Sequence, residues 1–76
     1  MTDIKERVFS VMADIFEINI SEITENTSPD NLENWDSMKQ MYLLAALEEE
    51  FNLRLTDNEM ADCINADAII QIFQHK

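Results

Sequence analysis

The 76-residue sequence contains no glycine, one proline, one cysteine and one histidine. Without glycine, tight two-residue hairpins between strands are disfavoured, so helices joined by longer loops are expected. The single cysteine, Cys63, excludes an intrachain disulfide and fits a reducing compartment. One cysteine and one histidine are too few soft ligands for a zinc site. The glycine-flanked serine elbow of hydrolases is excluded as well.

Basic side chains are also scarce. The sequence has 5 basic and 16 acidic residues, which gives a formal net charge of −11 at pH 7. A nucleic acid or an anionic membrane is bound through a patch of Lys and Arg, so neither is an expected partner. No apolar run approaches the ~18 residues that a transmembrane helix needs. The N-terminal residues lack the pattern of a secretory signal. A cytoplasmic monomer is the simplest expectation.

The length allows one small domain, which we expect to span residues 1–76. A chain this short buries only about 60% of the surface that its unfolded form exposes, which leaves little room for a deep active site. The hydrophobic fraction of 46% nevertheless separates the chain from disordered acidic tails.

Apolar residues recur at helical spacing in three segments of the chain. Asp36 is placed to cap the start of the second segment, and either Thr2 or Asp3 is placed to cap the first. These patterns predict main helices over residues 3–17, 37–51 and 66–75.

A fourth, short helix is predicted by a capping motif. Thr56 and Glu59 have the spacing of a capping box, in which the hydroxyl and the carboxylate each bond one free backbone amide. The motif predicts a helical segment over about 57–63. The expected fold class is therefore all-α: a small four-helix bundle of three main helices and a short third helix, with a long loop between helices 1 and 2.

Residues 18–36, which form this loop, lack helical periodicity and are rich in turn-forming Asn, Ser and Asp. Loops of this length are uncommon in compact domains and are often functional. Apolar side chains are spaced along the segment, so we expect it to be pinned to the core, with Trp35 supplying most of the burial. The expected anchors are Ile18, Ile20, Ile23, Leu32 and Trp35.

Ser37 lies in the first turn of the second predicted helix, directly after the loop. One interpretation is local: Asp36 caps the helix, and serine suits a first turn. The other interpretation is functional: the helix presents Ser37 for covalent modification. Phosphate esters are stabilised at helix N-termini by free amides and the helix dipole, by ~0.3–1 kcal/mol.

The second predicted helix has two opposed apolar stripes when its residues are placed 100° apart. A small domain can bury one of them, which contains Leu43, Leu47 and Phe51. The other begins beside Ser37 and is either a set of scattered surface residues or a docking strip, a use to which methionine is suited. It consists of Met38, Met41 and Ala45, with Tyr42 at its side and Glu48 and Glu49 at its far end.

Two motifs of this helix carry a resemblance. Residues 36–38 are Asp-Ser-Met, and residues 46–51 are Ala-Leu-Glu-Glu-Glu-Phe, with Leu43 between them. The pattern resembles the acyl carrier protein family, which has Asp-Ser-Leu at the head of its second helix and an apolar and acidic segment at its end. The length, the acidity, the long first loop and the short third helix are similar too, so the resemblance covers essentially the whole chain.

The resemblance implies that Ser37 takes a covalent 4′-phosphopantetheine arm from coenzyme A, with Asp36 as its neighbour in the motif. A phosphopantetheinyl transferase installs the arm, and its terminal thiol carries an acyl group as a thioester. Loading enzymes, synthases or acyltransferases then act on the carrier, which is not itself expected to be an enzyme.

The resemblance also implies two sets of contact residues. Family members dock their enzymes through the second helix, which here gives Met38, Met41, Tyr42, Ala45, Glu48 and Glu49. Acyl chains can shelter in the helical core of the family, which here gives Leu43, Leu47, Phe51, Ile64 and Ile70 as pocket residues.

Three positions depart from the family pattern. Met38 stands where leucine is usual, and Lys39 and Tyr42 stand where carriers of general fatty-acid synthesis often have acidic residues. The first half of the docking helix is thus less negative, which favours a specialised fatty-acid, lipid or polyketide pathway. An aminoacyl load, of D-alanyl or peptidyl type, is the alternative.

The remaining reactive side chains carry weaker signals. We expect His75 in an exposed tail, not as a general base, and Cys63 as a buried structural residue. Residues 48–50 lack the spacing and glycine of a calcium loop, so no metal site is expected. Two alternatives to a carrier are an unmodified helical interaction module and an enzyme acting alone, and the missing base, metal site and glycine-rich loop disfavour the second.

Overall fold

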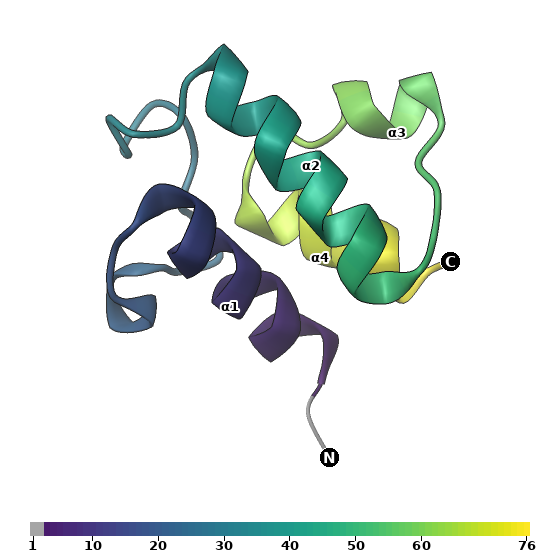
Figure 1. Ribbon diagram of the computed structural model, residues 1–76, viewed down its shortest axis with the longest axis horizontal. Helices are drawn as coiled ribbons and strands as arrows, with labels where there is room; N and C mark the ends of the chain where they lie inside the picture. Colours follow the sequence, from purple (N-terminus) through teal and green to yellow (C-terminus); the bar gives the residue numbers. More distant parts are fainter. Residues whose placement is uncertain (1–2) are drawn as a thin grey trace.

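The computed structural model describes residues 3–76, and all regular structure in that range is helical. Figure 1 shows α1 and α3 on opposite sides of α2, with α4 behind it. The expected all-α fold, with a long first loop and a short third helix, is confirmed. The elements are α1 (Ile4–Phe16), the 3-10 turn η1 (Ile20–Glu22), α2 (Ser37–Phe51), α3 (Asp57–Ala61) and α4 (Ala66–Gln74).

The predicted α2 has the observed bounds, whereas the other predicted helices extend too far. The largest difference is at the short helix, which was expected over about 57–63 and ends at Ala61. The chain leaves the helix there, and Cys63, two residues later, is buried in the core. α1 and α4 are each shorter than predicted by one residue at one or both ends.

Each α-helix begins at a residue whose side chain accepts a hydrogen bond from the amide three positions on. The predicted capping box is present, with Thr56 Oγ1 accepting from Glu59 N at 3.1 Å and Glu59 Oε1 accepting from Thr56 N at 2.9 Å. Asp3 caps α1, while Thr2 lies outside the described residues. The four cap residues are Asp3, Asp36, Thr56 and Asn65.

Two helices end in the left-handed backbone region although the chain has no glycine. Glu17, after α1, has φ 57°, and Asn52, after α2, has φ 53°. Asparagine adopts this conformation with little cost, whereas a glutamate there is less favourable. The turn at Glu17 allows the amide of Ile18 to bond the carbonyl of Ala13 and reverses the chain into the long loop.

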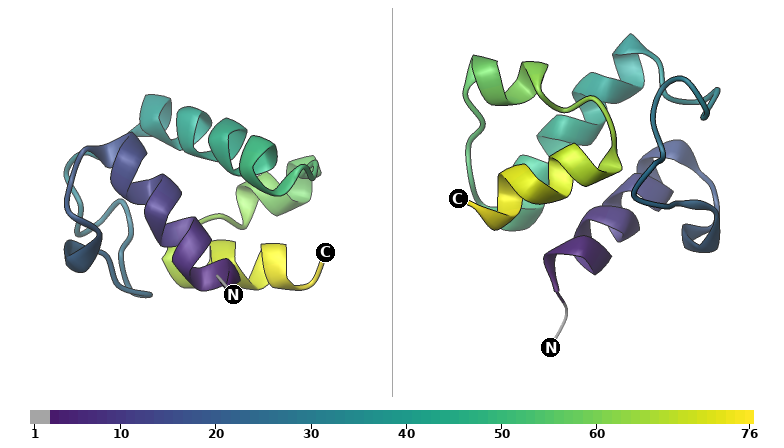
Figure 2. Two further views of the ribbon diagram at one scale, coloured as in Figure 1. Left: turned by 60° about the horizontal axis from the view of Figure 1, so that its bottom comes forward. Right: turned by 180° about the vertical axis from the view of Figure 1, so that it is seen from behind.

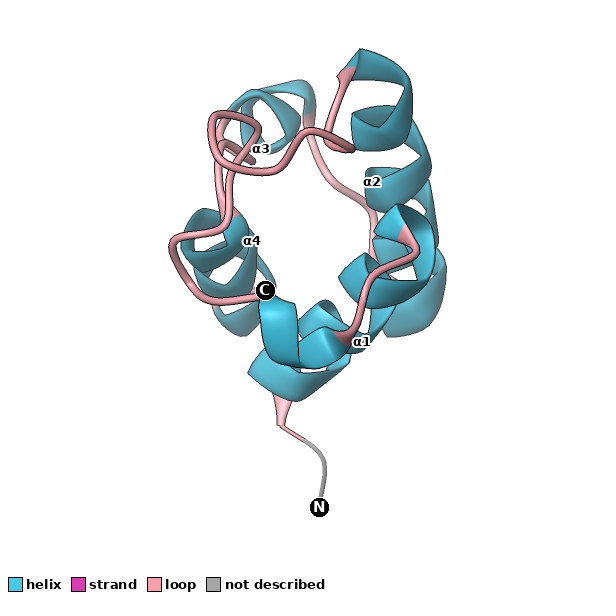
Figure 3. Cartoon of the chain, turned by 90° about the vertical axis from the view of Figure 1, so that its left-hand side faces the viewer, coloured by secondary structure: helices cyan, strands magenta, loops and turns pink. Residues whose placement is uncertain are grey.

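The core lies where α1, α2 and α4 meet. Figure 3 shows the four helices around a common centre, and the views in Figure 2 place α4 on the inner side of α2. The predicted inner stripe of α2 is buried at Leu43 and Leu47 and half-buried at Phe51. Phe16, the last residue of α1, is fully buried and packs on Trp35 with ring centroids 5.1 Å apart. The buried apolar residues are Val8, Met12, Phe16, Ile23, Trp35, Leu43, Leu44, Leu47, Leu55, Cys63, Ala66, Ile69, Ile70 and Phe73.

The long loop is pinned to the core, as predicted, but not by every expected anchor. Trp35 is 3% exposed and Ile23 is buried, whereas Ile20 is 49% exposed and is not an anchor. Ile20 lies in the turn η1, whereas the backbone at Ile23 is already extended. The two isoleucines are three residues apart but therefore do not lie on one side. Ile18 and Leu32 are half-buried against the core.

Backbone hydrogen bonds also attach the loop to the start of α4. The carbonyls of Glu25 and Thr27 accept from the amides of Asp67 and Ala66, at 3.0 and 2.9 Å. These amides belong to the first turn of α4 and have no carbonyl partner within the helix. The loop thus supplies hydrogen-bond acceptors to the N-terminus of α4, and these bonds hold it in place before the chain reaches Trp35 and α2.

Among residues 3–76, no helix combines the length and the apolar character needed to cross a membrane.

Candidate functional site

Ser37 is the first residue of α2, and its side chain lies on the surface. Asp36, in an extended conformation, caps the helix through Oδ1, which accepts from the amide of Lys39 at 2.8 Å. The cap directs the chain from the pinned loop into the helix, so Ser37 stands at the corner between them. The exposed hydroxyl is accessible to a modifying enzyme.

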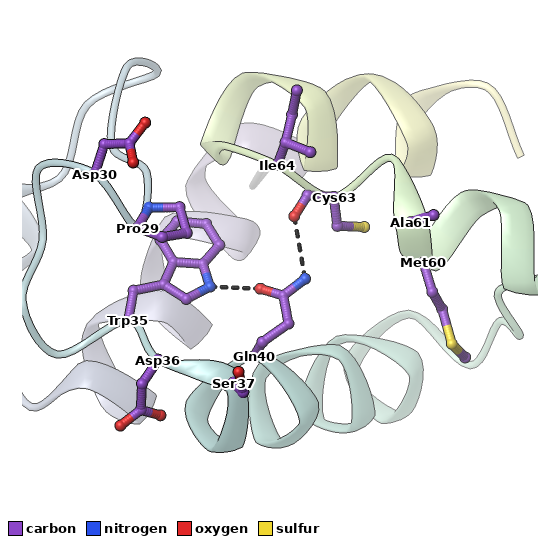
Figure 4. A pocket seen from close by; sticks show the side chains of 10 residues that line it. All are labelled: Pro29, Asp30, Trp35, Asp36, Ser37, Gln40, Met60, Ala61, Cys63 and Ile64. Atoms are coloured by element: carbon purple, nitrogen blue, oxygen red, sulfur yellow. Dashed lines mark hydrogen bonds between the residues drawn. The ribbon is translucent and has the colours of Figure 1, made fainter.

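An open surface pocket of about 550 Å³ lies beside Ser37. Figure 4 shows that α2 borders it on one side, the long loop on another and the end of α3 on the third. Carboxylates, an indole and apolar side chains share the lining, which is therefore of mixed polarity. The lining residues are Pro29, Asp30, Trp35, Asp36, Ser37, Gln40, Met60, Ala61, Cys63 and Ile64.

Gln40 joins two walls of this pocket, and the sequence interpretation did not single it out. Its Oε1 accepts from the indole N–H of Trp35, and its Nε2 donates to the carbonyl of Cys63 at 3.1 Å (Figure 4). One side chain on α2 thereby connects the end of the long loop to the segment that follows α3. A glutamine one turn after the serine is unremarkable in sequence, because one of its partners, the carbonyl of Cys63, is 23 residues away.

Cys63 is buried, as expected, and its Sγ donates to the carbonyl of Glu59 at 3.3 Å. Burial, together with the nearby negative charges of Asp62 and Glu59, raises the pKa of the Cys63 thiol to about 11. The thiol is therefore protonated at neutral pH and is a weak nucleophile. His75 is exposed and follows the last residue of α4.

The apolar strip next to Ser37 is on the surface. Met38, Met41 and Tyr42 are each more than half exposed, and Ala45 is exposed one turn further on. They lie on the outer side of α2, opposite the core residues Leu43 and Leu47. This is the arrangement that the two-stripe pattern predicted. The strip's use as a docking surface stays a prediction.

Two side chains, that of Lys39 in α2 and that of Asn34 in the long loop, contact the C-terminal end of α1. Lys39 Nζ donates to the carbonyl of Ile15 at 3.1 Å, and the side-chain amide of Asn34 donates to the carbonyl of Phe16 at 3.1 Å. Both donors satisfy free carbonyls at the C-terminus of α1, where a positive charge is also favoured by the helix dipole.

Glu48 is half-buried, and its Oε2 accepts from the amide of Leu55 at 2.8 Å. Glu50 forms an ion pair with Arg7 at 3.0 Å, and Arg7 also donates to the carbonyl of Glu50 at 2.7 Å. These bonds explain why acidic residues are tolerated at the unfavourable end of the helix dipole. The side chain of Glu49 is exposed and takes part in none of these bonds.

The five expected pocket residues do not lie together. Leu43, Leu47 and Ile70 are buried, and Phe51 is half-buried with its ring 4.8 Å from that of Phe73. Ile64 is 63% exposed and lines the surface pocket beside Ser37 instead, so its placement in the helical core was wrong. Its neighbour along the chain, Cys63, takes the inward position.

Comparison with known protein families gives one match. The family model described as "Phosphopantetheine attachment site" matches residues 6–73, from the first turn of α1 to the end of α4. A search of curated proteins found no significant match.

Proposed function

Because this chain belongs to the family defined by a phosphopantetheine attachment site, we propose that Ser37 is the residue to which the arm is attached. The chain is a carrier protein, and its cofactor is covalent 4′-phosphopantetheine. The bound group supplies a terminal thiol, which holds an acyl load as a thioester. The chain's own residues present the attachment point and meet the enzymes that use it.

The observation that carries this proposal is an exposed serine at the head of a 15-residue helix, beside an open pocket. Asp36 accepts from the amide of Lys39 through its side chain and from that of Gln40 through its carbonyl, so the amides of Ser37 and Met38 are the ones left without a carbonyl partner within the helix. Free amides and the helix dipole both favour a phosphate ester at this position. The residues around Ser37 therefore fit the group chemically.

Attachment requires a transferase and coenzyme A. The Ser37 oxygen forms a bond to the phosphorus of the phosphopantetheinyl group, the pyrophosphate bond of coenzyme A breaks, and 3′,5′-ADP leaves. In this proposal the hydroxyl proton passes to a base on the transferase, and His75 takes no part because it lies at the end of α4.

Partner enzymes dock, in this proposal, on the exposed strip formed by Met38, Met41, Tyr42 and Ala45, with Glu49 at its far end. Methionine side chains adapt to differently shaped surfaces, which suits a carrier that meets several enzymes in turn. The net charge of −11 speeds encounter with basic partners. Association should therefore slow as ionic strength rises, and an association rate indifferent to salt would contradict the electrostatic part.

We place the carrier in a specialised pathway of fatty-acid, lipid or polyketide synthesis. The support is the polarity of the first half of α2, where Lys39 and Tyr42 replace negative charge near Ser37. An aminoacyl load is the alternative, and both readings share the same attachment chemistry. Measuring which acyl or aminoacyl donors load the arm in the presence of a cognate enzyme separates them.

The test is the intact mass of the protein before and after incubation with coenzyme A and a broad-specificity phosphopantetheinyl transferase. We expect a gain of one phosphopantetheinyl group in the wild type and in Ser10→Ala, which removes another exposed serine from α1. Ser37→Ala should gain nothing while keeping the fold. No gain in the folded wild type, with a control carrier modified in parallel, would favour an unmodified interaction module.

A further inference from the structure

The two hydrogen bonds of Gln40 form a polar bridge between Trp35 and Cys63, which we call the Gln40 bridge. Trp35 is nearly fully buried, and its indole N–H is bonded to the amide oxygen of Gln40. On the other side, the amide nitrogen of Gln40 reaches the backbone carbonyl of Cys63. In Figure 4 the bridge spans the space between α2 and the segment after α3, within the pocket that Ser37 borders.

The bridge lies between the attachment point and the apolar core. Ser37, Gln40 and Leu44 are spaced three and four residues apart on α2, so they follow one another along one face of the helix. Ser37 is at the surface, Gln40 is half-buried, and Leu44 is buried in the core. An acyl chain that runs inward from Ser37 along this face of the helix meets the side-chain amide of Gln40 before it meets the core residue Leu44.

The partners on both sides of Gln40 are held in place. Trp35 packs against Phe16 in the core. Cys63 is buried, and α3 before it is tied to the C-terminal residue by an ion pair between Lys76 Nζ and Glu59 Oε1 at 2.9 Å. The walls that the bridge connects are therefore anchored on each side independently of Gln40.

From this placement we propose that the Gln40 bridge keeps the load in the surface pocket and out of the core, so that the carrier takes short acyl groups in preference to long alkyl chains. The inference rests on the proposed attachment of the arm to Ser37. An alkyl chain entering the core has to part Gln40 from both partners. Methylene groups cannot replace the lost hydrogen bonds, so the indole N–H and the Cys63 carbonyl would be left unpaired.

A short acyl group meets no such obstacle. The open pocket beside Ser37 has a volume of about 550 Å³ and offers apolar side chains, including Met60 and Ile64, at its outer part. A few carbons can contact these side chains while the bridge stays closed. The exposed side chain of Ile64 then contacts the short acyl group in this pocket.

The experiment compares acyl groups of two lengths on the same serine. The transferase loads acetyl- or octanoyl-phosphopantetheine onto Ser37 from the corresponding coenzyme A thioester, and intact mass verifies each product. The readouts are the rate of thioester cleavage by hydroxylamine, normalised to the same acyl-coenzyme A free in solution, and the melting temperature. Fluorescence of Trp35, the single tryptophan, reports on the pocket directly.

In the wild type we expect the two thioesters to be cleaved at the same normalised rate, with equal melting temperatures. Gln40→Leu replaces the bridge with an apolar side chain, so its octanoyl thioester should be cleaved several-fold more slowly than its acetyl thioester. Octanoyl loading should also raise its melting temperature and shift the emission of Trp35. Gln71→Leu, an exposed glutamine on α4 outside the pocket, should behave as the wild type.

Several-fold protection of the octanoyl thioester in the wild type would overturn the inference, and that comparison needs no variant to fold. Equal cleavage of both thioesters in a folded Gln40→Leu would also overturn it, because the bridge would then not be what excludes the chain. A wild type that accepts no arm on Ser37 overturns the proposed function, whereas a loaded but protected octanoyl group overturns the bridge alone.

Discussion

Asp36 has two separable properties: an oxygen that caps α2 and a negative charge beside Ser37. Its Oδ1 accepts from the amide of Lys39 at 2.8 Å. Asp36→Ala removes this acceptor, and the loss of an N-cap side chain typically costs about 1 kcal/mol of unfolding free energy. In a domain of this size that corresponds to a fall in melting temperature of roughly 4–8 °C.

Asp36→Asn keeps an oxygen at the same position and removes only the charge. Aspartate and asparagine are similarly good N-caps. The lost interaction between the charge and the helix dipole is about 0.3 kcal/mol at an exposed site, and the relief of self-repulsion in a chain of net charge −11 offsets part of it. The melting temperature of Asp36→Asn should therefore stay close to that of the wild type.

The same two variants separate folding from presentation of Ser37. Asp36→Ala should slow attachment of the arm more than Asp36→Asn, at a temperature where both are folded, because the cap positions the corner at which Ser37 stands. Asp3→Ala is the matched control, since Asp3 caps α1 with the same 2.8 Å bond, to the amide of Glu6. It should lose similar stability and keep the wild-type rate of attachment.

Thermal unfolding and a timed mass measurement of arm attachment provide both readouts. Equal destabilisation by Asp36→Ala and Asp36→Asn would refute the capping argument and assign the effect to charge. Slow attachment in Asp3→Ala would show that stability, and not the cap of α2, controls the modification.

Three further outcomes are expected. Leu47→Ala, at a fully buried position, should lower the unfolding free energy in urea by about 2–5 kcal/mol, and a loss below 1 kcal/mol would contradict the assigned core. Salt should raise the melting temperature by screening the net charge of −11, so a constant value from low to high ionic strength would argue against self-repulsion. Because the pKa of Cys63 is raised to about 11, its alkylation in the native protein should keep accelerating as pH rises through 10; a rate that levels off by pH 10 would refute the raised pKa.

The helices were predictable because their signals are local. The bounds of α2 follow from an apolar stripe and from Asp36, which bonds an amide three residues away. The capping box of Thr56 and Glu59 acts over the same distance. Each of these interactions is complete within one turn of helix, so the neighbouring residue types are sufficient to recognise it.

The contacts that shape the site were not predictable because they join distant segments. Gln40 bonds the carbonyl of Cys63 across 23 residues, and Lys39 bonds that of Ile15 across 24. The acceptor in each case is a backbone carbonyl, which every residue type has, so no sequence pattern marks it. The exposure of Ile64 is likewise set by tertiary packing. Either of the two adjacent apolar residues can turn inward, and in the folded chain Cys63 is the buried one.

The structure also changes how the docking helix should be understood. The sequence suggested that the surface charge of this helix becomes more negative from Lys39 to the acidic residues at its end. In the structure, however, Lys39 bonds a carbonyl of α1, and Glu48 bonds the amide of Leu55. The exposed side chains along the outer face of α2 after Ser37 are apolar, chiefly Met41 and its neighbours, and Glu49 is an exposed acid at the far end. In the proposed carrier, attraction at long range therefore comes from the net charge of the whole domain, whereas close contact depends on the methionines. Salt should then act mainly on the association rate, and Met41→Ala mainly on the dissociation rate.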